Sequence, residues 1–287
     1  MSDAAPSGPL APRLIDVRVP ARARGAVLVL HGGASRRDSA MVSPTQLSVL
    51  RMVPIARRIA RAGRGELAVF RLLNSRRGWD TGHTPVIDAA WALGEIAVRL
   101  DREVPACLVG HSLGGRAALL AAGHPTVRSA VALAPYVYPG DVAQGIAGRR
   151  LLIVHGDADR VASPARSAQL ARTLGRITDV EYVTVPGGRH AMLRHHRRFD
   201  GAAADFAVAT LLGDGTAQSA SSSGSTPSPA PDGEAPGCSS PGGSTSSLEA
   251  CSTPSGSASS IGSGRSSVMP SAYPAPRDRN DTPDPRA

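Results

Sequence analysis

The sequence predicts an α/β domain in which a mostly parallel sheet is covered by helices on both faces. Short apolar runs alternate along the chain with segments whose apolar residues recur at helical spacing. The run at residues 26–30, Ala-Val-Leu-Val-Leu, contains no polar residue, which is typical of a strand buried on both faces. Regular alternation of such strands with helices favours three layers, with the sheet in the middle.

Composition divides the 287-residue chain into three parts. Hydrophobic residues make up 41% of the chain, enough for one large domain, but large apolar side chains become rare from Gly213 onward. A segment rich in Ser, Gly and Pro buries too little surface to offset the entropy of ordering it. We therefore predict a flexible leader at residues 1–12, a folded domain at 13–212 and a disordered tail at 213–287.

The expected elements can be placed in order along the domain. Strands are expected near residues 13–19, 26–30, 67–72, 106–109, 129–134, 151–154 and 180–185, the first of them at a sheet edge. Helices are expected near residues 45–62, 85–100, 116–122 and 164–174, with a last one ending near 212. Pro54 predicts a break near Met52 in the first helix. The expected core side of the second helix comprises Ile87, Ala90, Trp91, Gly94 and Ile96.

Charge and composition argue against several classes of partner. The net charge is +9 and every basic residue is arginine, which can favour nucleic acid. However, the arginines are scattered, aromatic residues make up 3% of the chain, and no aromatic-rich strand typical of a binding module is present. No apolar run resembles a signal peptide or a membrane span, and the cysteines lack metal-ligand spacing. We expect a cytoplasmic protein without nucleic-acid, membrane or metal partners, and its oligomeric state is left open.

The stretch from Gly110 to Gly114, Gly-His-Ser-Leu-Gly, matches the pattern G-x-S-x-G. It lies between an expected strand and an expected helix, the context in which this pattern holds a serine on a sharp turn. A serine nucleophile, a plain strand-to-helix connection and a chance match all remain open for the pattern alone. The order of other polar residues favours Ser112 as a nucleophile.

Asp157 and Asp159 follow one expected strand, and His190 follows a later one. Parallel strands end at a common edge of the sheet, so these side chains are expected near Ser112. A neutral imidazole can take the proton of a serine hydroxyl, and a carboxylate can orient that imidazole. From the residues alone, either aspartate could serve as the acid.

Two backbone segments are candidate donors to a developing oxyanion. The loop His31-Gly32-Gly33 follows a buried strand, and the N–H group of Gly33 could face a ligand. The N–H group of Leu113, directly after the serine, would be the second donor. His31 is expected to shape this loop or to touch substrate.

Four segments together resemble the α/β-hydrolase family. They read Gly-His-Ser-Leu-Gly-Gly, His-Gly-Gly, His-Gly-Asp-Ala-Asp-Arg-Val and Gly-Gly-Arg-His, and they stand in the family's order across most of residues 13–212. The resemblance implies the three-layer α/β-hydrolase sandwich and serine-dependent hydrolysis through an acyl-enzyme, with no cofactor. In similar proteins the acid segment reads His-Gly-x-x-Asp, which puts the triad acid at Asp159 and makes Asp157 a turn residue.

Further residues are candidates for the substrate pocket. Trp79 and Tyr136 lie in loops after expected strands, where lining an acyl pocket and local packing are equally expected. His111 precedes the serine and is most simply structural, although it too could reach the pocket.

The segment 136–149 is too short for the lid domain that many members of the family insert there. The chain is therefore expected to have an open site, as in small carboxylesterases and dienelactone-hydrolase-like proteins. The predicted function is hydrolysis of a small-molecule carboxylic ester or thioester. The alternatives are acyl transfer or C–C bond hydrolysis by the same residues, and a catalytically silent binding scaffold.

Overall fold

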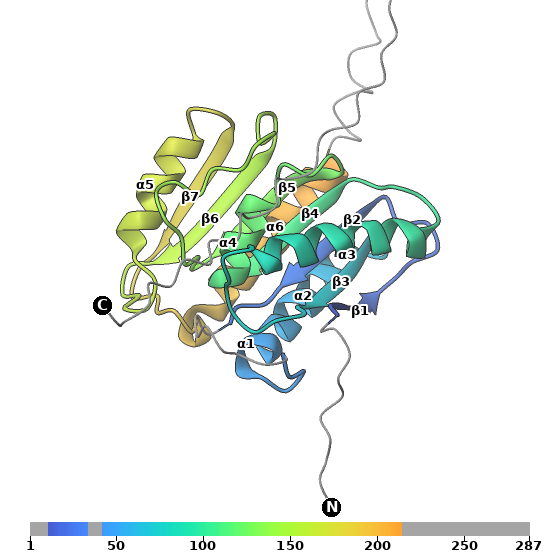
Figure 1. Cartoon of the computed structure of the whole chain (residues 1–287), viewed down its shortest axis with the longest axis horizontal. Helices are drawn as coiled ribbons and strands as arrows, with labels where there is room; N and C mark the ends of the chain where they lie inside the picture. Colours follow the sequence, from blue (N-terminus) through green and yellow to red (C-terminus); the bar gives the residue numbers. More distant parts are fainter. Residues whose placement is uncertain (1–10, 34–41, 214–287) are drawn as a thin grey trace, which may run out of the picture. The chain divides into compact units, whose positions relative to one another are not determined.

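The structure is a computed structural model that describes residues 11–33 and 42–213 (Figure 1). Its strands are β1 (Arg13–Arg18), β2 (Gly25–Leu30), β3 (Leu67–Leu73), β4 (Ala106–His111), β5 (Val127–Leu133), β6 (Arg150–Gly156) and β7 (Asp179–Val185). Its helices are α1 (Leu47–Leu50), α2 (Met52–Ala62), α3 (Thr84–Leu100), α4 (Leu113–Leu120), α5 (Pro164–Leu174), the short 3₁₀ helix η1 (Leu193–His195) and α6 (His196–Leu212). Nearly all of the predicted leader and tail lies outside the described residues.

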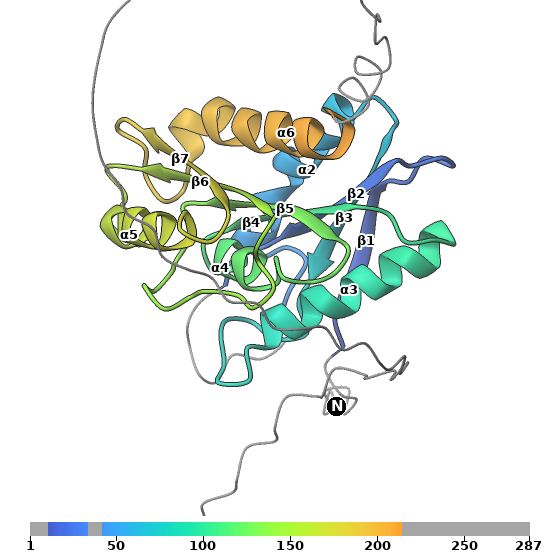
Figure 2. The ribbon, with the colours of Figure 1, turned by 90° about the horizontal axis from the view of Figure 1, so that it is seen from above.

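The sheet forms the middle of three layers, as predicted. Helices α2 and α6 cover one face, and α3, α4 and α5 cover the other (Figure 2). Alternate residues of β2 serve the two cores, with Leu28 and Leu30 in the α3–α4–α5 core and Val27 and Val29 in the α2–α6 core. Burial on both faces therefore explains the unbroken apolar run of this strand.

The strand order β1-β3-β2-β4-β5-β6-β7 places the site loops. All neighbours are parallel except β1, which pairs antiparallel with β3 at one edge, so the predicted edge strand is confirmed. From β2 the chain passes to β3 on one side and then returns to β4 on the other. Ligand sites of open parallel sheets form at such a switch point, outside the carboxyl ends of the strands.

Two details of the helices bear on the sequence predictions. The predicted break is confirmed, because α1 and α2 are separate and Pro54 lies in the first turn of α2, where its missing N–H has no cost. The predicted core side of α3 is wrong except for Ile96. Ile87 is 61% exposed and Trp91 38% exposed, and Ala90 and Gly94 are exposed as well.

The face of α3 is set by a polar contact. The buried carboxylate of Asp88 accepts hydrogen bonds from the N–H of Ser75 at 2.8 Å and from its hydroxyl at 2.9 Å. Asp88 therefore lies on the buried side of α3, together with Ala89, Ala92 and Leu93. The spacing of apolar residues does not reveal this polar contact, so it predicts the wrong buried face for α3.

The connection from β5 to β6 contains bends and turns but no helix, so the predicted absence of a lid domain at residues 136–149 is confirmed. Within the described part of the chain, no helix combines the length and the apolar character needed to cross a bilayer.

Candidate active site

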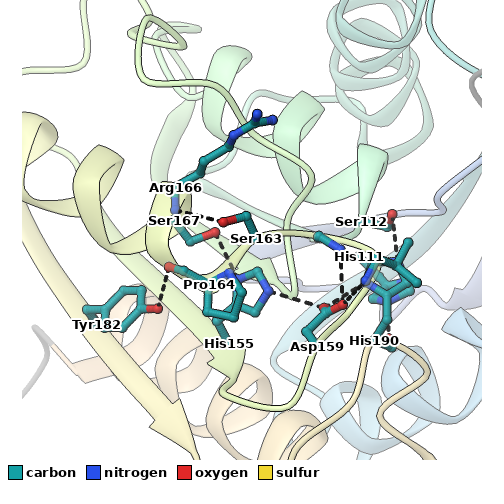
Figure 3. Close-up of polar contacts among 12 residues, drawn as sticks. His111, Ser112, His155, Asp159, Ser163, Pro164, Arg166, Ser167, Tyr182 and His190 are labelled. Carbon is teal, nitrogen blue, oxygen red and sulfur yellow. Dashed lines mark hydrogen bonds and ion pairs between the residues drawn. The ribbon is translucent and has the colours of Figure 1, made fainter.

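Three side chains from distant segments form a row of hydrogen bonds at the carboxyl edge of the sheet (Figure 3). Ser112 Oγ lies 3.0 Å from His190 Nε2, and His190 Nδ1 lies 2.8 Å from Asp159 Oδ2. A carboxylate only accepts, so Nδ1 carries the ring proton and Nε2 is free to accept from the serine hydroxyl. Such a row can transfer a proton from Ser112 to His190.

Ser112 sits on a strained turn between β4 and α4. Its φ of 56° and ψ of −119° lie in a region that residues with a side chain rarely adopt. A β-carbon built at Gly110 would collide with the backbone of Gly114, so the turn needs glycine at its first position. The turn is fixed by hydrogen bonds from the Ser112 N–H to the Leu133 carbonyl and from the Tyr136 N–H to the Ser112 carbonyl.

Close backbone contact brings the segments after β6 and β7 together. A β-carbon built at Gly156 would collide with the backbone of Gly188, so both segments approach each other only as glycine. The N–H of Ala158 donates to the Gly188 carbonyl at 3.1 Å, and the exposed Asp157 accepts from the Gly187 N–H at 2.7 Å. Asp157 therefore stabilises the loop that carries His190, which agrees with its predicted role as a turn residue.

The carboxylate of Asp159 is buried and receives four hydrogen bonds. Oδ1 accepts from the N–H groups of Val161 and Ala162 at 2.8 and 3.0 Å, and Oδ2 accepts from His190 and from His155 Nε2. Burial raises the pKa of Asp159, but the four hydrogen bonds together outweigh burial, and the pKa lies well below its ordinary value. Asp159 is thus held as a carboxylate.

His155 is the residue that the sequence analysis did not single out. Its ring is fully buried, with Nε2 3.1 Å from Asp159 Oδ2 and Nδ1 2.8 Å from Ser167 Oγ (Figure 3). Since Asp159 only accepts, the His155 proton lies on Nε2 and the Ser167 hydroxyl donates to Nδ1. The four-residue spacing from His155 to Asp159, across the end of a strand, is the only sequence signal for this contact.

His111 supports the backbone of His190. Its buried Nε2 donates to the His190 carbonyl at 2.9 Å, and the two ring centroids are 4.9 Å apart. Burial, together with the nearby His190, lowers the pKa of His111 to about 3. His111 is therefore neutral at ordinary pH, and its side chain is buried.

This burial predicts a pH-dependent stability. Below pH 6.5 the unfolded chain protonates His111, whereas the folded protein does so only near pH 3, so stability falls as the pH drops through this window. At about 1.4 kcal/mol per pH unit, the wild type should lose about 2 kcal/mol more between pH 6.5 and 4.5 than His111→Gln, which keeps a donor. Urea unfolding at both pH values measures this, and equal losses would contradict it.

The loop after β2 lies against the serine. A β-carbon built at Gly32 would lie 3.2 Å from Ser112 Cβ. His31 holds the loop, since its Nδ1 donates to the Gly32 carbonyl at 2.6 Å and its Nε2 accepts from the Asn74 N–H at 3.2 Å. Both ring nitrogens of this buried histidine are thereby occupied, so it shapes the loop.

The two candidate oxyanion donors come from the loop after β2 and from the start of α4. Gly33 ends the described part of the loop after β2 and packs on Gly78. Leu113 is the first residue of α4, and its N–H is among those that helical hydrogen bonding leaves unused. Both N–H groups stay candidates.

Of the two aromatic pocket candidates, Tyr136 lines a cavity of about 370 Å³ that has Asp159 in its wall. Trp79 packs against the core under α3, and the guanidinium of Arg116 lies 4.1 Å from its ring centroid. Trp79 is thus engaged in local packing.

Burial raises the pKa of Cys107 to about 12, so this thiol does not compete with Ser112 as a nucleophile.

Comparison with solved structures finds the same fold in several hydrolases. An α/β serine hydrolase homologue from Coxiella burnetii is 18% identical, with a TM-score of 0.53, over 70% of this chain and 94% of the other. A thermophilic esterase from Thermogutta terrifontis is 17% identical, with a TM-score of 0.54, over 71% and 90%. An acetyl ester-xyloside bifunctional hydrolase from Caldicellulosiruptor lactoaceticus is 14% identical, with a TM-score of 0.53, over 71% and 90%. No protein-family model and no curated protein sequence matches the chain.

Proposed function

The chain has the α/β-hydrolase fold, and from this premise we propose that it is a serine hydrolase of small or medium carboxylic esters or thioesters. The observation that carries the proposal is the hydrogen-bonded row from Ser112 through His190 to Asp159. Fold likeness alone is compatible with many functions, so the proposal depends on the chemistry of this row.

In the first half-reaction, Ser112 Oγ attacks the carbonyl carbon of the ester while its proton passes to His190 Nε2. The imidazolium keeps its Nδ1 proton on Asp159, whose negative charge stabilises it. As the tetrahedral intermediate collapses, the bond to the alcohol or thiol breaks and His190 Nε2 protonates the leaving group. The N–H groups of Gly33 and Leu113 are proposed to donate to the oxyanion.

In the second half-reaction, a water molecule takes the place of the leaving group. His190 Nε2 accepts one proton of this water as its oxygen attacks the acyl carbonyl, and then returns the proton to Ser112 Oγ as the acid departs. Residues 136–149 contain no lid domain, and we infer that water reaches the acyl-enzyme, which favours hydrolysis over acyl transfer.

Hydrolysis of 4-nitrophenyl esters of rising chain length tests the proposal. We expect turnover above the buffer rate, highest for acetate to hexanoate, and a matching release of acid from the thioester acetyl-CoA or from a simple alkyl thioester. Turnover only with an added alcohol acceptor would indicate an acyltransferase, and cleavage confined to β-diketones would indicate a C–C hydrolase. No turnover of any of these substrates, together with no labelling of Ser112 by a fluorophosphonate, would favour the silent scaffold.

Removing His155 should affect turnover more than substrate binding. His155→Leu leaves Asp159 with one donor fewer and the Ser167 hydroxyl without its acceptor, which should cost about 1–3 kcal/mol of unfolding free energy. Because Asp159 is then held less firmly against His190, kcat should fall about tenfold with little change in KM. His155→Gln, which can still donate to Asp159, should recover part of kcat, and equal kcat in all three proteins would contradict this role.

A further inference from the structure

The cavity of about 370 Å³ beside the site is built on the loop that holds the triad acid. Asp159 lies in its wall, and the loop that follows is anchored to Asp159 Oδ1 through the N–H groups of Val161 and Ala162. On the other side, Tyr136 lines the cavity while its N–H donates to the Ser112 carbonyl. The cavity therefore shares Asp159 with the hydrogen-bonded row and is joined through Tyr136 to the turn that holds Ser112, and a group bound in it could belong to a substrate of Ser112.

Two arginines, Arg160 and Arg166, line this cavity, and neither forms an ion pair with any carboxylate in residues 11–33 and 42–213. The nearby Arg116 differs, because its guanidinium makes two hydrogen bonds of 2.8 Å with Asp141. The single acidic residue in the cavity wall is Asp159, whose four hydrogen bonds occupy its lone pairs. Two guanidinium charges against the one carboxylate of Asp159 leave the cavity wall with a net positive charge.

Arg166 also lies beside an aromatic ring. Its guanidinium carbon lies 5.5 Å from the ring centroid of Tyr138, and the Arg116 guanidinium carbon lies 4.8 Å from the same ring. The backbone of Arg166 is fixed at the start of α5, where its N–H donates to Ser163 Oγ at 3.3 Å (Figure 3). The Arg166 guanidinium beside the cavity presents several N–H donors in the planar arrangement that suits a carboxylate.

We propose that this cavity binds a carboxylate of the substrate, so that the enzyme prefers esters carrying a free carboxylate to neutral esters of the same shape. Arg160 and Arg166 are the specificity-determining residues. This inference rests on the proposed hydrolase function, because it assigns a substrate class to the same site. The carboxylate can belong to the acyl part or to the alcohol part of the ester, and the test separates the two.

Two pairs of substrates, in each of which a carboxylate replaces a terminal methyl group, distinguish these arrangements when hydrolysis is followed by proton release. Monoethyl succinate against ethyl butyrate places the charge on the acyl side. The acetate ester of 3-hydroxypropanoate against propyl acetate places it on the alcohol side. For the wild type, we expect kcat/KM to be several-fold higher for the charged member of one pair, and the preference to shrink at high salt because both arginines are exposed.

The double variant Arg160→Gln, Arg166→Gln should lower kcat/KM for the preferred charged ester about three- to tenfold, because contacts of exposed charges are individually weak. Its kcat/KM for the neutral ester should stay within twofold of the wild type. Arg172→Gln is the matched control, since it removes the same charge from α5 at a residue outside the cavity wall, and it should leave both values unchanged.

Each other outcome overturns the inference. Equal kcat/KM for charged and neutral esters in the wild type means that the cavity does not select an anion, while the proposed function stands. An equal loss on both members of a pair in the double variant means that the arginines serve structure. If none of the four esters, the nitrophenyl esters and the thioesters is hydrolysed, the proposed function fails and the inference fails with it.

Discussion

Ser112→Ala is expected to lower kcat for ester hydrolysis by about 10⁶-fold, to the level left by substrate binding and oxyanion contacts. The variant lacks the oxygen that forms the acyl-enzyme. No other residue on the hydrogen-bonded row can replace this oxygen, because His190 takes up the serine proton and Asp159 orients His190. Initial rates with a 4-nitrophenyl ester, at enzyme concentrations high enough to measure the residual rate, give the effect.

The fold of this variant should survive. Alanine is smaller than serine, and at a φ of 56° the backbone strain is similar for both residues, so the free energy of unfolding should change by less than about 1 kcal/mol. Urea unfolding checks this. A variant that folds and keeps more than about 1% of wild-type kcat would remove Ser112 from the mechanism.

Asp159→Asn should lower kcat by about 10⁴-fold. The amide can present a donor where His190 Nδ1–H needs an acceptor, which turns the imidazole toward the tautomer that cannot accept the serine proton. The same substitution loses the charge that stabilises the imidazolium. Rates measured with the ester that the wild type hydrolyses fastest give the comparison.

Asp157→Asn is the matched control for this prediction. Asp157 is exposed and accepts from the Gly187 N–H, a bond that an asparagine oxygen can still accept. Its kcat should therefore stay within about twofold of the wild type. The reverse pattern, with Asp157→Asn inactive and Asp159→Asn active, would move the role of acid to Asp157.

The sequence was sufficient to predict the three-layer fold, the edge strand and the break before α2, because these follow from buried strands and from proline. It also identified three of the polar side chains that meet in space. Gly110, Gly156 and Gly188 explain why these side chains meet. Each glycine lets two backbone segments come close together, and these segments carry the side chains of the row.

Other features depend on contacts that a linear pattern does not carry. The buried face of α3 is set by the hydrogen bonds of Asp88 to Ser75, and a polar residue on the inner side misleads an argument from apolar spacing. His155 lies at the end of an apolar strand, where a histidine is most simply a packed side chain. Its hydrogen bond to Asp159 forms only because the turn after β6 brings Asp159 back toward the end of the strand.

The most direct test of the account is to treat the full-length protein with a fluorophosphonate and to locate the adduct by intact mass and peptide mapping. The hydrogen-bonded row predicts one phosphonyl group per chain, on Ser112, formed much more slowly in His190→Ala and absent in Ser112→Ala. An unlabelled wild-type protein, or an adduct on another residue that persists in Ser112→Ala, would contradict the claim that this row makes Ser112 a nucleophile.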